Sequence, residues 1–407
     1  MNGTVSAWWR SQRKFLPLVG LFVTFRLMML VTFLPGDLTR FGDYPYYYAL
    51  ARFSDDGYLP FVHYWSEHLP VFPFLSIAIY RLSRLVSGGS YEAYVYLFGG
   101  MMVAFDTGSL WLFLRLAHRL WGEERALQLG WTYSLLFVPL IFCWWTFEGV
   151  TAFFILLALV LLVEGHERGS AVVVGLGAMT KLVPLLILPA VVRTRPLRRW
   201  LSYSLVVGMV VMAIAVPLLW VGGPFAVASF RSIVARGSYE TVWALIDGNL
   251  STGLLGAATD HFDLAKATAP AGNPARLPEW LKTGLFGVLY LFIFLKADLN
   301  LNLNLNLKRL VSFVCLTLVV FFLWSKGWSP QWQVFLLPLI LLALPYRRGL
   351  LFVLTLSVVN LAEWPVLLSR GLNEWLYLTV PLRTALLVLL AAELWQRVHG
   401  WSAGEQA

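Results

Sequence analysis

The acidic residue Asp43 lies shortly after the first long apolar stretch of the chain. It stands just beyond the apolar residues 16–35, where a substrate dissolved in water and a substrate dissolved in lipid could meet. A carboxylate in this place can act as a general base and take a proton from an attacking hydroxyl. The alternative is a structural role, in which Asp43 caps a short interfacial helix that Pro45 helps to begin. The sequence leaves both roles open.

Several cations that could bind a phosphate are expected on the same side of the membrane as Asp43. Lys181 lies at the apex of a short helical hairpin, 170–192, and Lys326 follows another apolar run. Arg231 and Arg236 belong to a long outer segment. A lysine ammonium binds phosphate as a point charge, but long basic side chains also reach the headgroup level without a ligand. For the two arginines, the alternative is an ordinary solvated loop charge.

Arg26 differs from these cations because it lies midway along the first apolar stretch. An ionisable group at that depth costs ~2.5 kcal/mol or more unless it faces a partner or water. Asp106, in the middle of the apolar segment 92–116, is the expected structural partner. Such a pair would explain both residues without a role in catalysis.

The segment 237–249 has a composition that suits a sugar. It combines Trp243 with hydroxyl, amide and carboxylate side chains. Sugars stack their apolar faces on aromatic rings and need several hydrogen-bond partners for their hydroxyls. An ordinary folded loop can have the same composition. Glu148 and His261 are further candidates on the same side.

The composition identifies the protein as a membrane protein. Of its 407 residues, 59% are hydrophobic and 13% are charged, and the mean hydropathy is +0.70. This excludes a soluble enzyme. The net charge of +9 is scattered in short clusters between apolar runs rather than gathered in one patch, so it argues against nucleic-acid binding. Cys143 and Cys315 lie inside apolar runs, and no metal-binding motif is evident.

A membrane-spanning helix needs about 20 mainly apolar residues, and the chain offers about twelve such segments, some of them short. We therefore expect an all-α polytopic membrane protein with two long extracytoplasmic segments. The expected apolar segments are 16–35, 92–116, 127–145, 149–163, 170–180, 182–192, 201–222, 281–297, 309–324, 332–345, 350–368 and 376–395.

The topology depends on residues 69–86, which are too short and too charged for a confident span. If they lie along the interface, Arg115, Arg119, Arg125 and Arg168 are cytoplasmic, as the positive-inside rule prefers. Both termini are then cytoplasmic, and the polar candidates face the outer side. The Leu-Asn alternation at 299–307 is interpreted as a low-complexity insertion without a chemical role.

Together these residues resemble the GT-C superfamily of glycosyltransferases, and most closely family 87, which includes polyprenyl-phosphate-mannose-dependent mannosyltransferases. The resemblance rests on four patches spread over most of the chain. They are Arg26 with Asp43-Tyr44, Gly57-Tyr58-Leu59-Pro60 and Glu67-His68-Leu69-Pro70; Lys181-Leu182-Val183-Pro184; Glu240 to Gly248; and Ser325-Lys326-Gly327 with Ser329-Pro330-Gln331-Trp332. The sequence departs from the family pattern at His68-Leu69-Pro70, where members often have Tyr-Pro-Pro after the glutamate.

The resemblance implies three parts of the chain. Residues 1–222 would form an N-terminal module of about seven transmembrane helices with a first outer loop at 36–91. An extracytoplasmic loop would follow at 223–280, and a bundle of about five transmembrane helices would occupy 281–407. It also implies that Asp43 is the catalytic carboxylate and that the donor is a polyprenyl-phosphate sugar.

The expected reaction is an inverting transfer of a sugar, with mannose as the expected sugar, to a hydroxyl of a glycolipid or glycan. Preorganised positive charge must stabilise the departing phosphate. The candidates for this are Lys181, Lys326, Arg231 and Arg236, with the deeper Arg26 less favoured. The residues expected to contact sugar or acceptor are Glu67, His68, Glu148, Trp243, His261 and Gln331.

No cofactor is expected, and a divalent metal is not favoured because Asp55 and Asp56 are adjacent and their side chains diverge. A prokaryotic plasma membrane is the expected location. The alternative from another class is a transporter or flippase for a lipid-linked or polar substrate. Transporters tend to show related halves and ionisable groups near the bilayer midplane, whereas here most polar candidates gather at the outer boundary.

Overall fold

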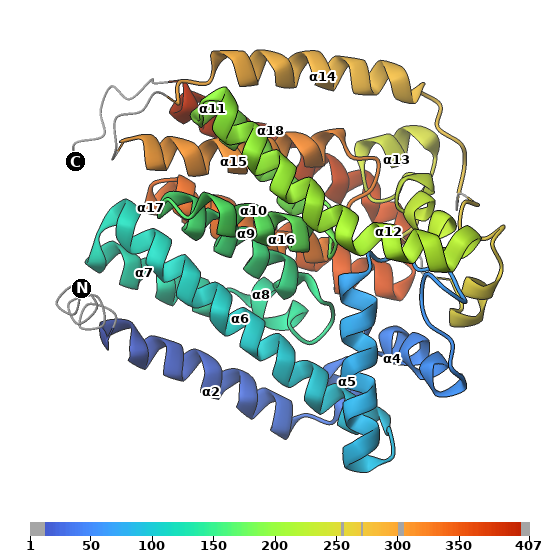
Figure 1. Cartoon of the computed structure of the whole chain (residues 1–407). Coiled ribbons are helices and arrows are strands. Elements are labelled where there is room, and N and C mark those ends of the chain that lie inside the picture. The colour runs from blue at the N-terminus through green and yellow to red at the C-terminus, as the bar shows by residue number, and fades with distance from the viewer. Residues whose placement is uncertain (1–12, 254–255, 270–271, 300–304, 400–407) are drawn as a thin grey trace.

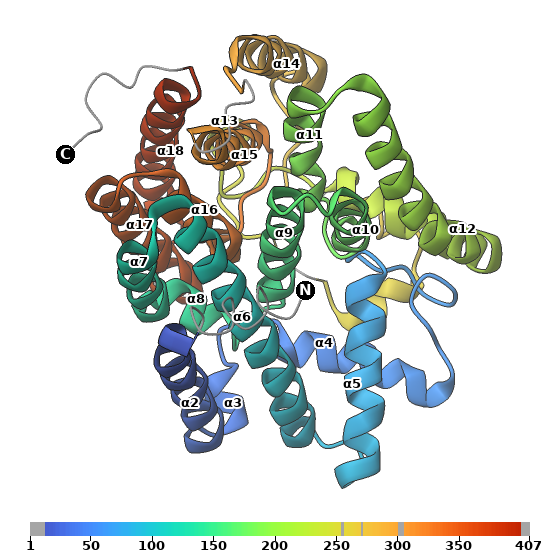
Figure 2. The ribbon, with the colours of Figure 1, turned by 60° about the vertical axis from the view of Figure 1, so that its left-hand side comes forward.

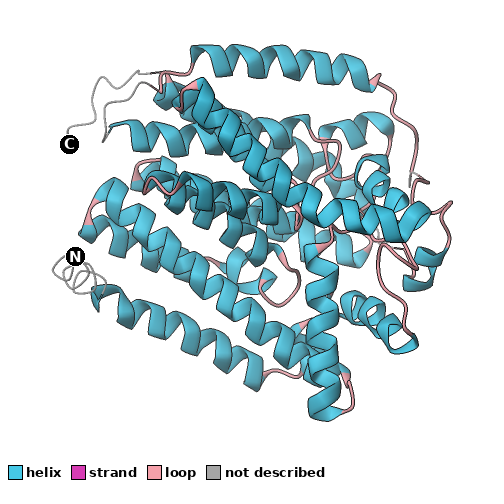
Figure 3. Cartoon of the chain, viewed as in Figure 1, coloured by secondary structure: helices cyan, strands magenta, loops and turns pink. Residues whose placement is uncertain are grey.

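The computed structural model describes residues 13–253, 256–269, 272–299 and 305–399, and these residues fold as helices and loops without a β-strand (Figure 3). Most of the Leu-Asn run lies outside the described residues, and its end joins the start of helix α15. The all-α fold expected from the apolar pattern is therefore confirmed for the described part of the chain.

In that part, six helical segments are long and apolar enough to cross a membrane: Arg13–Thr32 (with α2, Leu16–Thr32), α6 (Tyr91–Trp121), α12 (Leu197–Ala235), Leu307–Trp324 (of α15, Leu305–Trp324), Tyr346–Arg370 (with α17, Tyr346–Leu361) and Asn373–Val398 (with α18, Leu376–Val398). The other expected spans correspond to shorter or more charged helices, so the number twelve is not confirmed. These helices are α7 (Glu123–Leu135), α8 (Phe137–Phe142), α9 (Glu148–Val163), α10 (Glu167–Ala178), α11 (Leu188–Thr194), α14 (Glu279–Lys296) and α16 (Gln333–Ala343).

Helix α5 (Val71–Ser87) runs at an angle to α2 and α6 in Figure 1, and Figure 2 shows it at the side of α6 away from α2. One of its faces is buried, while Arg81 and Arg84 are exposed beside the exposed Leu85. Basic side chains beside exposed apolar residues can extend to the headgroup level of a membrane. The orientation of α5 therefore favours the topology in which residues 69–86 lie along the interface.

The ends of the bundle differ in what they carry. The beginning of α2, the turn between α6 and α7, the beginning of α12 and the end of α18 lie together at one end (Figure 1). Short helices α4 (Tyr44–Arg52) and α13 (Val242–Asp247) lie at the opposite end with the last part of α12. Segments that are distant in the sequence therefore meet at this end of the bundle, and Asp43, which directly precedes α4, lies there with them.

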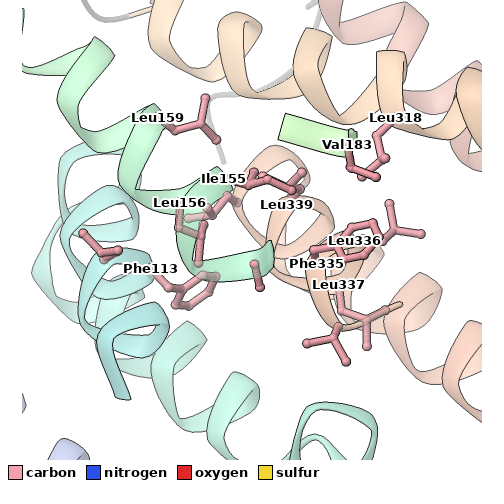
Figure 4. Close-up of a cluster of buried hydrophobic side chains, with 14 of the residues drawn as sticks. Phe113, Ile155, Leu156, Leu159, Val183, Leu318, Phe335, Leu336, Leu337 and Leu339 are labelled. Carbon is pink, nitrogen blue, oxygen red and sulfur yellow. The ribbon is translucent and has the colours of Figure 1, made fainter. Parts of the chain in front are cut away.

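The interior is built around α16, whose residues Gln333–Ala343 are all buried. A helix that is hydrophobic on all sides must be surrounded by others. Figure 4 shows Phe335 and Leu339 of α16 near Ile155 of α9 and Leu318 of α15. This packing fixes α9, whose first residue is Glu148, beside the loop that precedes α16.

Helix α12 is longer than expected. It breaks at Gly223, whose φ of 49° is left-handed, and then continues to Ala235. At the break, a Cβ on Gly222 would collide with the carbonyl of Phe61, so this glycine permits the first outer segment to pack on the helix. The expected loop 223–280 therefore begins with a helical extension that places Arg236 over that segment.

Arg26 and Asp106 join α2 to α6. Arg26 is fully buried, its Nε lies 3.1 Å from Oδ2 of Asp106, and its guanidinium lies 3.4 Å from the ring centre of Phe22. The pair is the structural partnership that the depth of Arg26 indicates. It keeps Arg26 away from the outer cations, so the structure does not place this residue in a phosphate site with them.

Removing one member of this pair should destabilise the protein more than removing both. In Asp106→Leu an uncompensated buried arginine remains, and we expect a loss of about 3–5 kcal/mol in the free energy of unfolding. The double variant Arg26→Leu/Asp106→Leu should recover most of that loss because no buried charge is left unpaired. Unfolding of the purified protein in detergent measures both. A double variant as unstable as Asp106→Leu would contradict the pairing.

Candidate active site

Asp43 stands directly before α4, at its N-cap position, but its side chain makes no capping hydrogen bond. Its backbone carbonyl accepts the amide of Tyr47 at 2.9 Å, and its Oδ2 accepts the Tyr47 hydroxyl at 3.2 Å. Tyr47 is buried, so its hydroxyl orients the carboxylate of Asp43 from the protein interior. Asp43 as a residue is of intermediate exposure, and its carboxylate is not used by the helix terminus, which leaves it available for chemistry.

The loop that carries Asp43 is fastened to the segment before α9. The amide of Asp43 donates to the carbonyl of Trp145 at 2.7 Å, and a Cβ on Gly42 would collide with the backbone of Trp145. Glycine is therefore required at position 42 for this close approach. The same approach brings Asp43 to the beginning of α9, where Glu148 lies.

Gly42→Ala should displace this loop. We expect a loss of about 1–3 kcal/mol in the free energy of unfolding, the usual cost of overpacking. Gly36→Ala is the matched control because a Cβ there meets nothing within 4 Å. Thermal unfolding of both variants, with the same detergent and lipid, compares them. Equal stabilities would show that the Gly42–Trp145 contact does not hold the loop.

Glu67 and Arg236 form an ion pair beside Asp43. The Nη2 of Arg236 donates to Oε2 of Glu67, and the α12 extension also binds this segment through Ser229, whose Oγ accepts the amide of Ser66 at 2.8 Å. Glu67 is nearly buried while Arg236 is about one-third exposed. Arg236 is thus positioned by Glu67 and can still reach a ligand.

His68 follows Glu67 and is enclosed by aromatic rings. Its ring centre lies 5.7 Å from that of Tyr47, 5.2 Å from Phe72 and 5.1 Å from Phe147. Burial lowers the pKa of His68 to about 4, so the imidazole is neutral near pH 7. His68 therefore contributes shape rather than charge.

His261 joins the second outer segment to the first. Its Nδ1 lies 2.6 Å from the carbonyl of Trp65, so that nitrogen must carry the proton and donate. Its Nε2 is then the acceptor for the hydroxyl of Tyr46. The ring also stacks on Trp65 with centres 4.1 Å apart. These contacts give His261 a positioning role for Tyr46 and Trp65.

Lys181, in the loop after α10, forms an ion pair with Glu148 and interacts electrostatically with Asp43. Aromatic rings enclose its ammonium: Nζ lies 5.9 Å from the ring centre of Phe147, 5.0 Å from Trp332 and 5.7 Å from Phe335. Cation–π contacts of this kind hold an ammonium without consuming its hydrogen bonds. Lys181 stays partly exposed, whereas Glu148 is buried.

The charges around Asp43 are coupled. Burial raises the pKa of Asp43 to about 7, with further increases from the negative charges of Glu67 and Glu148, and Tyr47 and Arg236 act in the opposite direction. Burial also lowers the pKa of Lys181, while Glu148 and Asp43 support its charged form. Asp43 is thus a carboxylate whose proton affinity suits a base near neutral pH.

Other candidates from the sequence lie elsewhere. Lys326 donates to the carbonyl of Val234 at 2.9 Å and belongs with Lys282 and Glu279, outside the group around Asp43. Arg231 is exposed on α12. Gln331 precedes Trp332, the residue that covers Lys181.

Trp243 does not face Asp43. Its Nε1 donates to the carbonyl of Leu323 at 3.0 Å, and its ring lines a cavity of about 490 Å³ bounded by α14, α15 and α18. Neither Asp43 nor Lys181 lines that cavity. In the segment 237–249, the Oγ of Ser238 donates to Asp247 at 2.6 Å and accepts from Asn249 at 2.9 Å. These internal bonds favour the folded-loop interpretation of this segment.

Several of these contacts were not expected from the sequence, among them the pairing of Arg236 with Glu67. The hydrogen bond from Tyr47 to Asp43 spans four residues on a helix, a spacing that could have indicated it. The pairing of Lys181 with Glu148 and the position of Lys282 had no comparable local signal. Within the described ranges, no group of three or more His, Cys, Asp or Glu side chains is arranged to hold a metal ion.

The sequence model of glycosyltransferase family 87 matches residues 73–325, which is more than half of the chain. The chain belongs to glycosyltransferase family 87. The match includes Glu148, Lys181, Arg236 and His261, and it begins after Asp43. Family membership favours the transferase over the transporter alternative and confirms the expected GT-C assignment.

The transferase also resembles a solved structure, the crystal structure of ArnT from Cupriavidus metallidurans bound to undecaprenyl phosphate. The sequences are 16% identical, the match covers 94% of this chain and 78% of that chain, and the TM-score is 0.50. At this identity the likeness concerns the fold. No curated protein matches the chain.

Proposed function

We propose that this transferase moves mannose from a polyprenyl-phosphate donor to a hydroxyl of a glycolipid or glycan, with inversion, on the extracytoplasmic side of a prokaryotic plasma membrane. Both termini are cytoplasmic in this proposal, and no divalent metal is required. The observation that carries it is the position of the Asp43 carboxylate among two partly exposed cations, Arg236 and Lys181.

In the proposed reaction, Asp43 takes the proton of the acceptor hydroxyl as its oxygen forms a bond to the anomeric carbon. The bond between that carbon and the phosphate oxygen breaks on the opposite face, and the bonding pair leaves with the polyprenyl phosphate. Arg236 and Lys181 can stabilise the charge that develops on this phosphate. Glu67 and Glu148 hold the two cations in place before the donor binds.

The donor class is supported by two observations. Family 87 membership brings the resemblance to polyprenyl-phosphate-dependent enzymes, and the ArnT structure of similar fold contains undecaprenyl phosphate. Mannose rests on the family resemblance.

Asp43→Asn should lower the transfer rate by about 10²–10⁴-fold, the usual contribution of a general base, because an amide accepts no proton. Asp37→Asn is the matched control: Asp37 is exposed on the preceding short helix and should leave the rate unchanged. Transfer from a polyprenyl-phosphate sugar by purified protein measures both. Retained activity in Asp43→Asn would falsify the role of Asp43.

The pH dependence should report the same carboxyl. Because burial raises the pKa of Asp43 to about 7, the base is protonated and inactive below that pH, and kcat/KM should rise as the pH increases through about 7. Tyr47→Phe removes a hydrogen bond that lowers this pKa, so the rise should move to higher pH. A rise near pH 4, unaffected by Tyr47→Phe, would contradict the assignment.

A further inference from the structure

A cluster of ionisable side chains that the proposed reaction does not use is buried beside the last helices. Glu240 comes from the segment after α12, Glu363 from the turn that follows α17, and Arg383 from α18. Each of these residues is at most 3% exposed. Arg383 donates through Nη1 to Oε2 of Glu363 and through Nη2 to the backbone carbonyl of Glu240. Three distant parts of the chain are therefore joined at one point.

The cluster contains two carboxyl groups and one guanidinium. If both carboxyls were ionised, a negative charge would remain in the interior without a partner, which is costly. Burial raises the pKa of Glu240 well above its usual range, the negative charge of Glu363 adds to this, and the charge of Arg383 only partly opposes it. Glu240 therefore carries a proton near pH 7, and Glu363 forms a balanced pair with Arg383.

That proton completes the hydrogen bonding of both carboxyls. Oε2 of Glu240 and Oε1 of Glu363 are buried oxygens that have no hydrogen-bond donor among the described residues. Two ionised carboxylates only accept, whereas a protonated carboxyl donates one hydrogen bond, and these two side chains lie within reach of such a bond. Because the guanidinium of Arg383 binds Glu363 directly, Glu363 is the ionised member and Glu240 donates to it.

The backbone of Glu240 is held in an uncommon conformation. Its φ of 49° lies in the left-handed region, which a non-glycine residue seldom adopts. Its neighbours fasten it to the loop 325–332. The amide of Tyr239 donates to the carbonyl of Lys326 at 3.1 Å, and the hydroxyl of Thr241 donates to the same carbonyl at 2.9 Å. Such a conformation persists where the surroundings over-determine it, so the direction of the Glu240 side chain is fixed.

Arg236, one of the two cations of the proposed site, belongs to the same segment as Glu240. It precedes Glu240 by four residues, and it interacts with Tyr239. Its ion-pair partner is Glu67, beside Asp43. A displacement of Glu240 would therefore move Arg236 relative to Asp43.

Lys181, the other cation, is connected to the cluster through two tryptophans of the loop 325–332. The ring centre of Trp328 lies 4.7 Å from the guanidinium carbon of Arg383 and 6.1 Å from the ring centre of Trp332. The ring centre of Trp332 lies 5.0 Å from Nζ of Lys181. The cluster thus also supports the aromatic wall around Lys181.

We propose that Glu240 is a positioning residue of the transferase, whose protonated carboxyl donates to Glu363 and so keeps Arg236 and the loop 325–332 in place. The proposal rests on the proposed function, in which Arg236 and Lys181 bind the phosphate of the donor. Glu240 acts through these two cations rather than on the substrate. The pair of Glu363 and Arg383 is the fixed acceptor to which it is fastened.

Infrared spectroscopy of the full-length protein in detergent tests the proton without any need for transfer. A protonated carboxyl has a C=O stretch that an ionised carboxylate lacks. Spectra recorded near pH 7 in the Asp43→Asn background remove the contribution of Asp43, whose pKa is about 7. A buried carboxyl band should be present in this background and lost when Glu240→Gln is added. Glu374→Gln, at an exposed position, is the matched control and should leave the band unchanged.

Binding of undecaprenyl phosphate tests the positioning role. Glu240→Leu should weaken binding by about tenfold or more, the scale of one hydrogen bond to a charged group, because leucine donates nothing to Glu363. Glu240→Gln should bind as the wild type does, since its amide donates in place of the protonated carboxyl. Glu240→Gly suits the left-handed backbone but also lacks the donor, so it should bind as weakly as Glu240→Leu.

Three outcomes would overturn the proposal. The first is an infrared band that Glu240→Gln leaves unchanged. The second is wild-type binding in Glu240→Leu or Glu240→Gly. The third is binding in Glu240→Gln that is as weak as in Glu240→Leu at equal unfolding temperatures, because the amide would then fail to replace the donated hydrogen bond.

A transfer assay on the same variants separates this proposal from the proposed function. If Glu240→Gln removes the band and Glu240→Leu weakens binding, but the wild type transfers no sugar from any polyprenyl phosphate, the positioning role stands and the proposed function fails. If the wild type transfers mannose and Glu240→Leu binds and transfers equally well, the proposed function stands and the positioning role fails.

Discussion

The pairing of charges away from water governs the organisation of this protein. Arg26 pairs with Asp106 inside the bundle, and Lys181 pairs with Glu148 and Arg236 with Glu67 at the end of the bundle that carries α4. An unpaired charge withdrawn from water is costly, so each pair fixes the relative position of the segments that carry it. The inner pair connects two helices and is fully buried, whereas in each outer pair the cation keeps some exposure and can exchange its partner for a phosphate.

The outer pairs also explain why segments far apart in the sequence meet. Glu67 belongs to the first outer segment, and Arg236 reaches it because α12 continues past the break at Gly223. Glu148 begins α9, which the buried helix α16 supports, and it receives Lys181 from the loop after α10. The site therefore depends on helix packing deep in the bundle as well as on the local geometry of its loops.

Much of this arrangement could be predicted from the sequence. Apolar runs located the helices, and the cost of burying Arg26 indicated its pairing with Asp106, because both signals arise from the chain's own composition. The sequence offered Lys181, Lys326, Arg231 and Arg236 alike as cations near Asp43, and it could not predict which of them group around that carboxylate. The grouping depends on the extension of α12 and on the path of the loop 325–332, which follow from tertiary packing. The break at Gly223 had a local cue in the neighbouring Pro224, but the continuing helix did not.

The same coupling links the binding of the donor to the strength of the base. In the proposed reaction a phosphate competes with Glu67 and Glu148 for Arg236 and Lys181, so negative charge accumulates around Asp43 as the donor arrives. Like charges disfavour ionisation of a carboxyl and raise its pKa. The carboxylate then holds a proton more tightly, which makes it a stronger base towards the acceptor hydroxyl. His68 is neutral near pH 7 and therefore adds no positive charge that would oppose this effect.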